Sequence, residues 1–237
     1  MISLAVVCED QADFQLVSCL VDRLLTQSFE WIDDSVLNNY REWFYQGSDN
    51  NLFFKWASIK RLCRQQNIKF HGHIDGVPAF PDARTGLKAL RLIERLAGGA
   101  INVILLIRDQ DDEPTRYDGL NQAKTEFVKA AFNDSIVIGF AIIERESWML
   151  SGYIAQGMSE AELIASLRRD LGFDPAAAPQ LLTAGKDDTA VKSPKRVLKV
   201  LTNGDFDREQ QCVALTPIEV LKTRGQNNGL TELRTPD

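Results

Sequence analysis

Continuous apolar runs and amphipathic stretches alternate along the first part of the chain. The runs at residues 2–8, 101–107 and 135–143 are almost entirely apolar, which is typical of strands buried on both faces of a parallel sheet. The stretches at 13–27 and 84–97 instead repeat their apolar positions with helical spacing. This alternation predicts an α/β fold with a mostly parallel sheet flanked by helices.

The segments between these elements carry weaker patterns. Residues 34–46 and 51–66 are rich in aromatic side chains and are expected to be helical, so a helical insert is predicted at about 29–66. We further expect a strand at 68–74 and a helix at about 118–132.

The pattern changes toward the C-terminus, where shorter helices alternate with polar loops and no strong strand is predicted. The helices are expected at 159–171, 194–202 and 217–223. The sequence therefore predicts an α/β domain over 1–155 and a helical C-terminal extension over 156–237, whose Gly- and Asn-rich end is expected to fray.

Composition narrows the classes of protein that fit the chain. The formal net charge of −6 argues against a general nucleic-acid coat protein but permits a local basic patch. The start lacks the basic region of a signal peptide, and no apolar run approaches the roughly 20 residues of a membrane span. We therefore expect a cytoplasmic protein without membrane contact. The four cysteines form no C-x-x-C pair and give no indication of a zinc knuckle.

Acidic side chains follow three of the predicted strands. Glu9 follows the first, Asp109 and Asp111 follow the second, and Glu144 and Glu146 follow the third. Ligands of open α/β sheets bind at the carboxyl ends of the strands, so these acids converge if the strands are neighbours. Carboxylates gathered in one place repel each other unless a cation lies among them, and Mg²⁺ or Mn²⁺ prefers such oxygen ligands. Acids also follow strands because loops are solvated, and near helix starts they favour the helix dipole.

Two short motifs resemble the TOPRIM fold, a Rossmann-like fold of topoisomerases, primases and related nucleases. Its first motif is Glu-Gly-x-Ser/Thr-Glu, which Glu9 matches at the first position and Asp13 at the last, while Asp10 stands in place of the glycine. Asp109 and Asp111 match its D-x-D motif. The resemblance implies that Glu9, Asp13, Asp109 and Asp111 hold a divalent metal ion.

A later stretch, IIERESWML, resembles a segment of a bacterial TOPRIM-like family met beside ATPases in mobile and antiphage loci. Glu144, Glu146 and Trp148 fit that segment, and Pro194-Lys195 fits a Pro-Lys pair that leads a C-terminal helix of the family. The resemblance spans most of the chain through short motifs.

The resemblance implies a Mg²⁺- or Mn²⁺-dependent nuclease that cleaves phosphodiester bonds. Glu9 is then a general acid/base or a ligand, Asp109 and Asp111 hold the ion, and Glu146 with Glu144 supports a second ion or orients water. It also implies a nucleic-acid substrate, an ATPase partner, a possible homo-oligomer, and a role as effector of an antiphage defence or toxin-like system.

A lysine is expected to neutralise phosphate charge in the transition state. The basic stretch VKSPKRVLK supplies Lys192 and Lys195, and Lys186 lies shortly before it. A solvated helix face explains the same lysines without catalysis.

Other assignments stay open at this point. The chain is alternatively a non-catalytic TOPRIM-fold subunit that binds or regulates an ATPase, which the loss of the motif glycine at Asp10 favours. A D-x-D motif also occurs in haloacid-dehalogenase-type phosphatases and in glycosyltransferases, but Glu9 stands where such a phosphatase needs its nucleophilic aspartate.

His71 and His73 are more typical of a structural role than of a metal site. The aromatic residues of 29–56 form a core or partner surface, or stack on bases.

Overall fold

The structure is a computed structural model that describes residues 1–46, 51–69, 73–74, 76–129, 135–185 and 187–233. The chain forms two compact units. The N-terminal unit comprises residues 1–108 and 113–139, and the C-terminal unit comprises residues 109–112 and 140–233. The domain boundary at residue 155 stays a prediction.

A parallel sheet built around the first strand organises the N-terminal unit. The strands are β1 (Ile2–Cys8), β2 (Arg41–Trp43), β3 (Phe54–Lys55), β6 (Val103–Asp109) and β7 (Ser135–Ala141). Their order is β2-β1-β6-β7, and β3 also pairs with β1, beside Val7 and Cys8. β1 runs parallel to β2, β3 and β6, which confirms the predicted α/β class with a parallel sheet.

Hydrogen bonds at the two ends of β6 show that β7 is parallel to it. Ser135 N donates to Asn102 O at 3.4 Å near the start of both strands, and Gln110 N donates to Ala141 O at 2.9 Å near their ends. Because the pairs advance in the same direction, β1, β6 and β7 all end at one edge of the sheet. The three strands whose acids were expected to converge are therefore neighbours.

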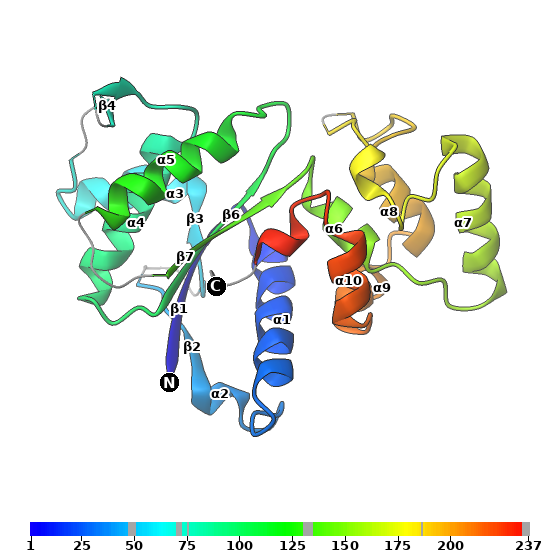
Figure 1. The fold of residues 1–237 in the computed structure, drawn as a ribbon, viewed down its shortest axis with the longest axis horizontal. Coiled ribbons are helices and arrows are strands. Elements are labelled where there is room, and N and C mark those ends of the chain that lie inside the picture. The colour runs from blue at the N-terminus through cyan, green and yellow to red at the C-terminus, as the bar shows by residue number, and fades with distance from the viewer. Residues whose placement is uncertain (47–50, 70–72, 75, 130–134, 186, 234–237) are drawn as a thin grey trace. The chain divides into compact units, whose positions relative to one another are not determined.

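Helices lie on both sides of this sheet. They are α1 (Gln11–Ser28), α2 (Leu37–Tyr40), α3 (Trp56–Gln65), α4 (Ala83–Ala97) and α5 (Arg116–Val128). In Figure 1, α3, α4 and α5 lie together beside the sheet and α1 lies on its other side. Gly119 brings α5 close to the chain before α4, because a Cβ atom there would lie 1.7 Å from Pro81 O.

The region predicted as a helical insert differs from that prediction. Of the expected helix over 34–46, only the short α2 forms, and Arg41–Trp43 is instead strand β2. The expected helix over 51–66 begins only at Trp56, because Phe54–Lys55 pairs with β1. Aromatic residues favour pleated, half-buried surfaces, and β1 offers backbone groups that need partners.

The aromatic residues of this region mostly build the core. Phe53 and Phe54 are fully buried, and the ring of Phe14 stacks on Phe53 at 5.3 Å between centroids. Trp31 is exposed and packs edge-on against Tyr40 at 4.7 Å. The core assignment is therefore confirmed for the two phenylalanines.

The strand predicted at 68–74 is not part of the main sheet where it is described. Its end, β4 (His73–Ile74), pairs antiparallel with β5 (Val77–Pro78) in a separate two-stranded sheet. Residues 70–72, including His71, lie outside the described residues.

The C-terminal unit beyond β7 consists of helices and loops, with no strand among its described residues. Its helices are α6 (Arg145–Ser151), α7 (Met158–Leu171), α8 (Pro194–Thr202), α9 (Phe206–Ala214) and α10 (Ile218–Arg224), with short 3₁₀ turns η1 (Pro179–Leu181) and η2 (Leu230–Leu233). α6 packs against α8, α9 and α10. The predicted helical extension is confirmed, while α9 was not predicted. No helix in the described part of the chain is long and apolar enough to span a bilayer.

Candidate active site

A buried carboxylate, Glu144, occupies the junction between β7 and α6. Glu144 is 1% exposed, and its Oε1 accepts a hydrogen bond from Lys195 Nζ at 2.9 Å. Its Oε2 is also buried and has no hydrogen-bond partner within the described residues. Burial raises the pKa of Glu144 to about 7, against the opposing effect of Lys195. Perturbed carboxylates with one specific charge partner are typical of functional sites.

Backbone contacts fix the turn that carries Glu144. Ser147 Oγ lies 2.7 Å from both Ile142 O and Glu144 O, within donating distance of each. Asn228 O accepts from Ile142 N at 3.1 Å, and Asn228 Nδ2 donates to Ser147 O at 2.8 Å. Asn228 is fully buried, so the expectation that the Asn-rich end frays is wrong at this residue.

The second half of the pair comes from the start of α8. Ser193 caps this helix by accepting from Arg196 N at 3.2 Å, and Pro194 occupies its first turn. Lys195 therefore projects from a fixed helix start, and its Nζ lies 3.9 Å from Asp188 Oδ1 as well.

The loop before α8 passes closely over the Glu144 segment. A Cβ atom at Gly185 would lie 2.5 Å from Ile143 Cγ2 and 3.8 Å from Glu144 Oε1. Lys192 is exposed, and its carbonyl oxygen accepts from Ala184 N at 3.1 Å. The third candidate lysine, Lys186, lies outside the described residues.

The D-x-D residues are attached to the same junction. Asp109 ends β6, and Asp111 N donates to Ile143 O at 3.0 Å, next to Glu144. Asp111 has a φ of 49°, in the left-handed region, so the extended geometry of β6 ends before it. Both aspartates are half-buried.

Glu146 lies in the first turn of α6. It is 7% exposed, and its Oε1 accepts from Arg145 Nη2 at 3.0 Å. Its negative charge contributes to the raised pKa of Glu144. Glu146 is thus close enough to Glu144 to influence its charge.

The two remaining predicted ligands belong to the N-terminal unit. Asp13 closes a capping box at the start of α1, because its Oδ2 accepts from Glu9 N at 2.9 Å and from Asp10 N at 3.3 Å. The Glu9 carboxylate forms an ion pair with Arg108, which also binds Asp82 at 2.9 Å. A cation of the protein itself therefore accompanies Glu9, and the capping role explains why Asp13 is buried.

Whether the site could hold a metal ion depends on the side chains that are available as ligands. In the described segments, no three His, Cys, Asp or Glu side chains gather into a group that could hold a metal. Mg²⁺ usually takes only one or two carboxylates and completes its shell with water and substrate phosphate oxygens. An ion of that kind needs only one or two carboxylates near this junction, and Asp109 and Asp111 stay its predicted ligands.

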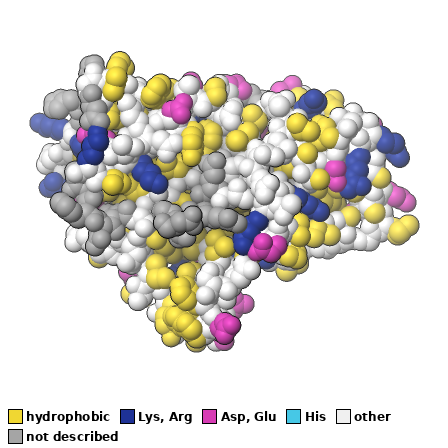
Figure 2. Space-filling view, in the orientation of Figure 1, with side chains coloured by type: hydrophobic (Ala, Val, Ile, Leu, Met, Phe, Trp, Pro, Cys, Tyr) yellow, Lys and Arg dark blue, Asp and Glu magenta, His cyan; other side chains and the backbone are white. Residues whose placement is uncertain are grey.

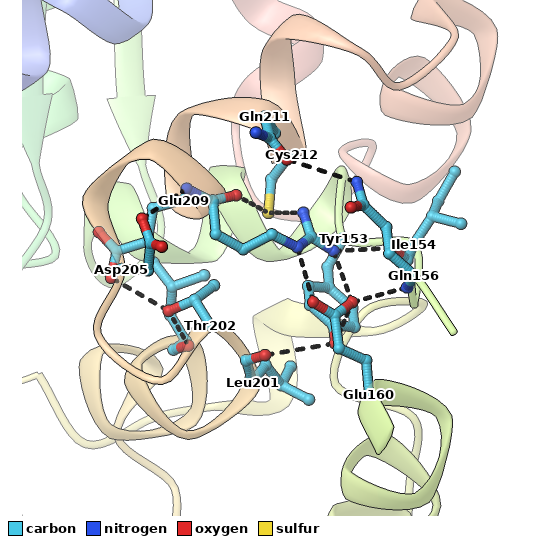
Figure 3. A network of polar contacts seen from close by, with 12 residues as sticks. Tyr153, Ile154, Gln156, Glu160, Leu201, Thr202, Asp205, Glu209, Gln211 and Cys212 are labelled. Carbon is cyan, nitrogen blue, oxygen red and sulfur yellow. Dashed lines mark hydrogen bonds and ion pairs between the residues drawn. The ribbon is translucent and has the colours of Figure 1, made fainter. Parts of the chain in front are cut away.

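A second ion pair in the C-terminal unit has a structural character (Figure 3). Arg208 donates from Nε and Nη2 to the two oxygens of Glu160, each at 2.8 Å, and from Nη2 to Ile154 O at 2.8 Å. Tyr153 OH donates to Glu160 at 3.1 Å. Arg208 holds the pKa of Glu160 at about 2, whereas burial raises that of Tyr153.

Sequence reasoning found Glu144 and Lys195 but missed several residues that place them. Asn228 and Gly185 carry no local signal of their role, since both act on chain segments distant in sequence. No family model matches the chain, and neither a curated protein nor a solved structure matches it.

Proposed function

We propose that the chain is a TOPRIM-like, metal-dependent nuclease whose centre lies in the C-terminal unit, at the junction of Glu144, Lys195 and the aspartates that end β6. One observation carries this proposal. A buried carboxylate meets a lysine through one oxygen, and its other oxygen has no partner among the residues that the structure describes, on a segment hydrogen-bonded to Asp111. A purely structural pair would be expected to satisfy both oxygens.

The residues take distinct roles in phosphodiester hydrolysis. Asp109 and Asp111 would hold Mg²⁺ or Mn²⁺, which supplies Lewis acidity toward the phosphate and a more acidic water. Glu144 accepts the proton of the water that attacks phosphorus, and the leaving oxygen takes up a proton as the P–O bond breaks. Lys195, beside Glu144, neutralises the charge that develops on the phosphate. Glu9 stays a predicted ligand. Arg108 would have to release the Glu9 carboxylate before this carboxylate could bind the ion.

The test is cleavage of supercoiled DNA and of RNA by the full chain with Mg²⁺ or Mn²⁺. We expect Asp111→Asn and Lys195→Met to lose roughly 100-fold or more in rate, the order found when one charge-stabilising group is removed. Asp170→Asn and Lys60→Met change exposed residues of α7 and α3 and should keep full activity. Equal rates in all four variants, or no cleavage with either ion even beside an ATPase partner, would refute the proposal.

A second candidate function is a non-catalytic subunit that binds or regulates an ATPase. The ion pair of Glu9 with Arg108 favours it, as does the lack of a three-ligand group among the described side chains. Thermal unfolding separates the two, because an ion that binds the folded state raises the melting temperature by mass action. A Mg²⁺- or Mn²⁺-dependent rise that vanishes in Asp111→Asn supports the nuclease, and no rise supports the regulatory subunit.

A further inference from the structure

A groove runs along α8 on the surface of the C-terminal unit. Its volume is about 570 Å³, and its lining residues are Asp188, Thr189, Arg196, Lys199, Val200 and Asn203. This volume lies within the range of sites that hold a ligand of nucleotide size. Five of its six lining residues have polar or charged side chains and none is aromatic, so the groove offers hydrogen bonds and charge but no stacking platform.

The charge of this surface differs from that of the chain as a whole. α8 carries three basic residues and no acid, in a chain of net charge −6. Lys199 is exposed and has no ion-pair partner in the described part of the chain, and the guanidinium of Arg196 donates a hydrogen bond to Val191 O at 3.4 Å. Over the whole face shown in Figure 2, basic and acidic side chains are interspersed. α8 is therefore a local basic site.

The groove adjoins the candidate active site through Asp188. Asp188 lines the groove, and its Oδ1 lies 3.9 Å from Lys195 Nζ, which binds Glu144 at 2.9 Å. Lys195 and Arg196 are neighbours on α8, so one helix serves both places. A polyanion held in the groove would reach Lys195 without crossing a separate element.

We propose that the groove on α8 binds the sugar-phosphate backbone of the nucleic-acid substrate, with Arg196 and Lys199 contacting phosphates. This inference rests on the proposed function, since it assigns the groove to the strand that is cleaved. Phosphate contacts position a nucleic acid without reading its sequence, and the absence of aromatic residues from the lining fits recognition of the backbone rather than of bases. Asp188 holds Lys195 and makes no phosphate contact.

The experiment is binding of a fluorescent oligonucleotide to the full chain, measured by anisotropy in EDTA so that no cleavage is needed. Arg196→Gln/Lys199→Gln should bind about tenfold more weakly or worse, and the slope of log K against log salt should fall by about two, one for each lost phosphate contact. Arg169→Gln/Lys60→Gln removes two exposed charges elsewhere and should bind as the wild type does. The charge-conserving Arg196→Lys/Lys199→Arg should retain most of the affinity.

Several outcomes would overturn this inference. They are no oligonucleotide binding by the wild type, equal binding by the α8 double variant, and an equal loss in the control variant. Polyglutamate that displaces the oligonucleotide at matched charge concentration would assign the groove to an acidic protein segment instead. Failure of the proposed nuclease is distinguishable, because it appears as absent cleavage while the α8-dependent binding in EDTA persists.

Discussion

Two ion pairs of the C-terminal unit face a cation with a carboxylate, yet they hold that carboxylate in opposite ways. The pKa of Glu160, beside Arg208, is lowered to about 2, whereas that of Glu144, beside Lys195, is raised to about 7. Glu160 receives both nitrogens of a guanidinium fork, the backbone N–H of Gln156 at 2.7 Å and the hydroxyl of Tyr153. Glu144 receives one hydrogen bond from a lysine.

The two carboxylates differ both in burial and in their donors: Glu144 is almost fully buried and meets one donor, whereas Glu160 is only partly buried and meets four. A bidentate arginine with further donors offsets the cost of burial and yields a rigid structural pair. A single lysine offsets only part of that cost and leaves a group that exchanges a proton near neutral pH. The first pair therefore stabilises helices α7 and α9, and the second is suited to chemistry.

Breaking the structural pair should have the largest effect on stability. Arg208→Met leaves Glu160 charged and without its main donors, and we expect a loss of about 3–5 kcal/mol in the free energy of unfolding. Urea unfolding at pH 7, followed by tryptophan fluorescence, measures this. Arg169→Met, an exposed arginine of α7, is the matched control and should change stability by less than about 0.5 kcal/mol. A loss as small as that of the control would show that the network contributes little.

Crowding the Glu144 segment should have an intermediate effect. Gly185→Ala places a Cβ atom 2.5 Å from Ile143 Cγ2, and overpacking of this kind costs about 1–3 kcal/mol. The same urea titration applies. In a double-mutant cycle with Ile143→Ala, the cost of the Gly185 change should fall, because the colliding methyl group is gone. An undiminished cost would locate the conflict elsewhere.

Removing Lys195, the partner of Glu144, should have a smaller effect on stability, and this effect should depend on pH. The folded-state pKa of Glu144 lies above its ordinary value of 4.5, so its stabilising contribution is complete below about pH 4.5 and is lost as pH rises through about 7. Lys195 lowers this pKa, so Lys195→Met should raise it further and extend the loss to higher pH.

We therefore expect Lys195→Met to cost about 1 kcal/mol at pH 8.5, since the side chain of Lys195 is 43% exposed and solvent screens the pair. The cost should nearly disappear at pH 5.5, where Glu144 is protonated in the folded state of both proteins. Thermal unfolding over this pH range measures the difference, and Lys192→Met is the exposed control. A cost independent of pH would show that Glu144 does not titrate in this range.

The strong local patterns of the sequence predicted most of the fold. The apolar run of β1 and the amphipathic repeats of α4 and α8 gave elements within a residue or two of those observed. The segment 34–46 could not be assigned in this way, because its pairing with β1 decides its conformation. Tertiary contacts of this kind override local helix propensity.

The candidate site was predicted residue by residue but not as an arrangement. Glu144 was selected because it follows a predicted strand, and Lys195 through a resemblance and a basic stretch, but nothing in their spacing predicts that they meet. Asp13 stays a predicted ligand, and the capping box that it forms as the third residue of α1 was not predicted. The pairing of Glu9 with Arg108 depends on the register of β1 against β6, which no local pattern gives.

The buried Asn228 makes the helical extension inseparable from the junction it supports. Besides the turn at Ile142 and Ser147, it accepts from the indole of Trp148 at 2.7 Å and donates to Ser151 at 2.8 Å. A protease cut between α10 and Asn228 would detach the residue that makes hydrogen bonds to Ile142, Ser147, Trp148 and Ser151. Engineered fragments that retain the sheet and α6 but end at α10 would thus keep the acidic residues. They would lose the Asn228 hydrogen bonds that fix the turn carrying Glu144.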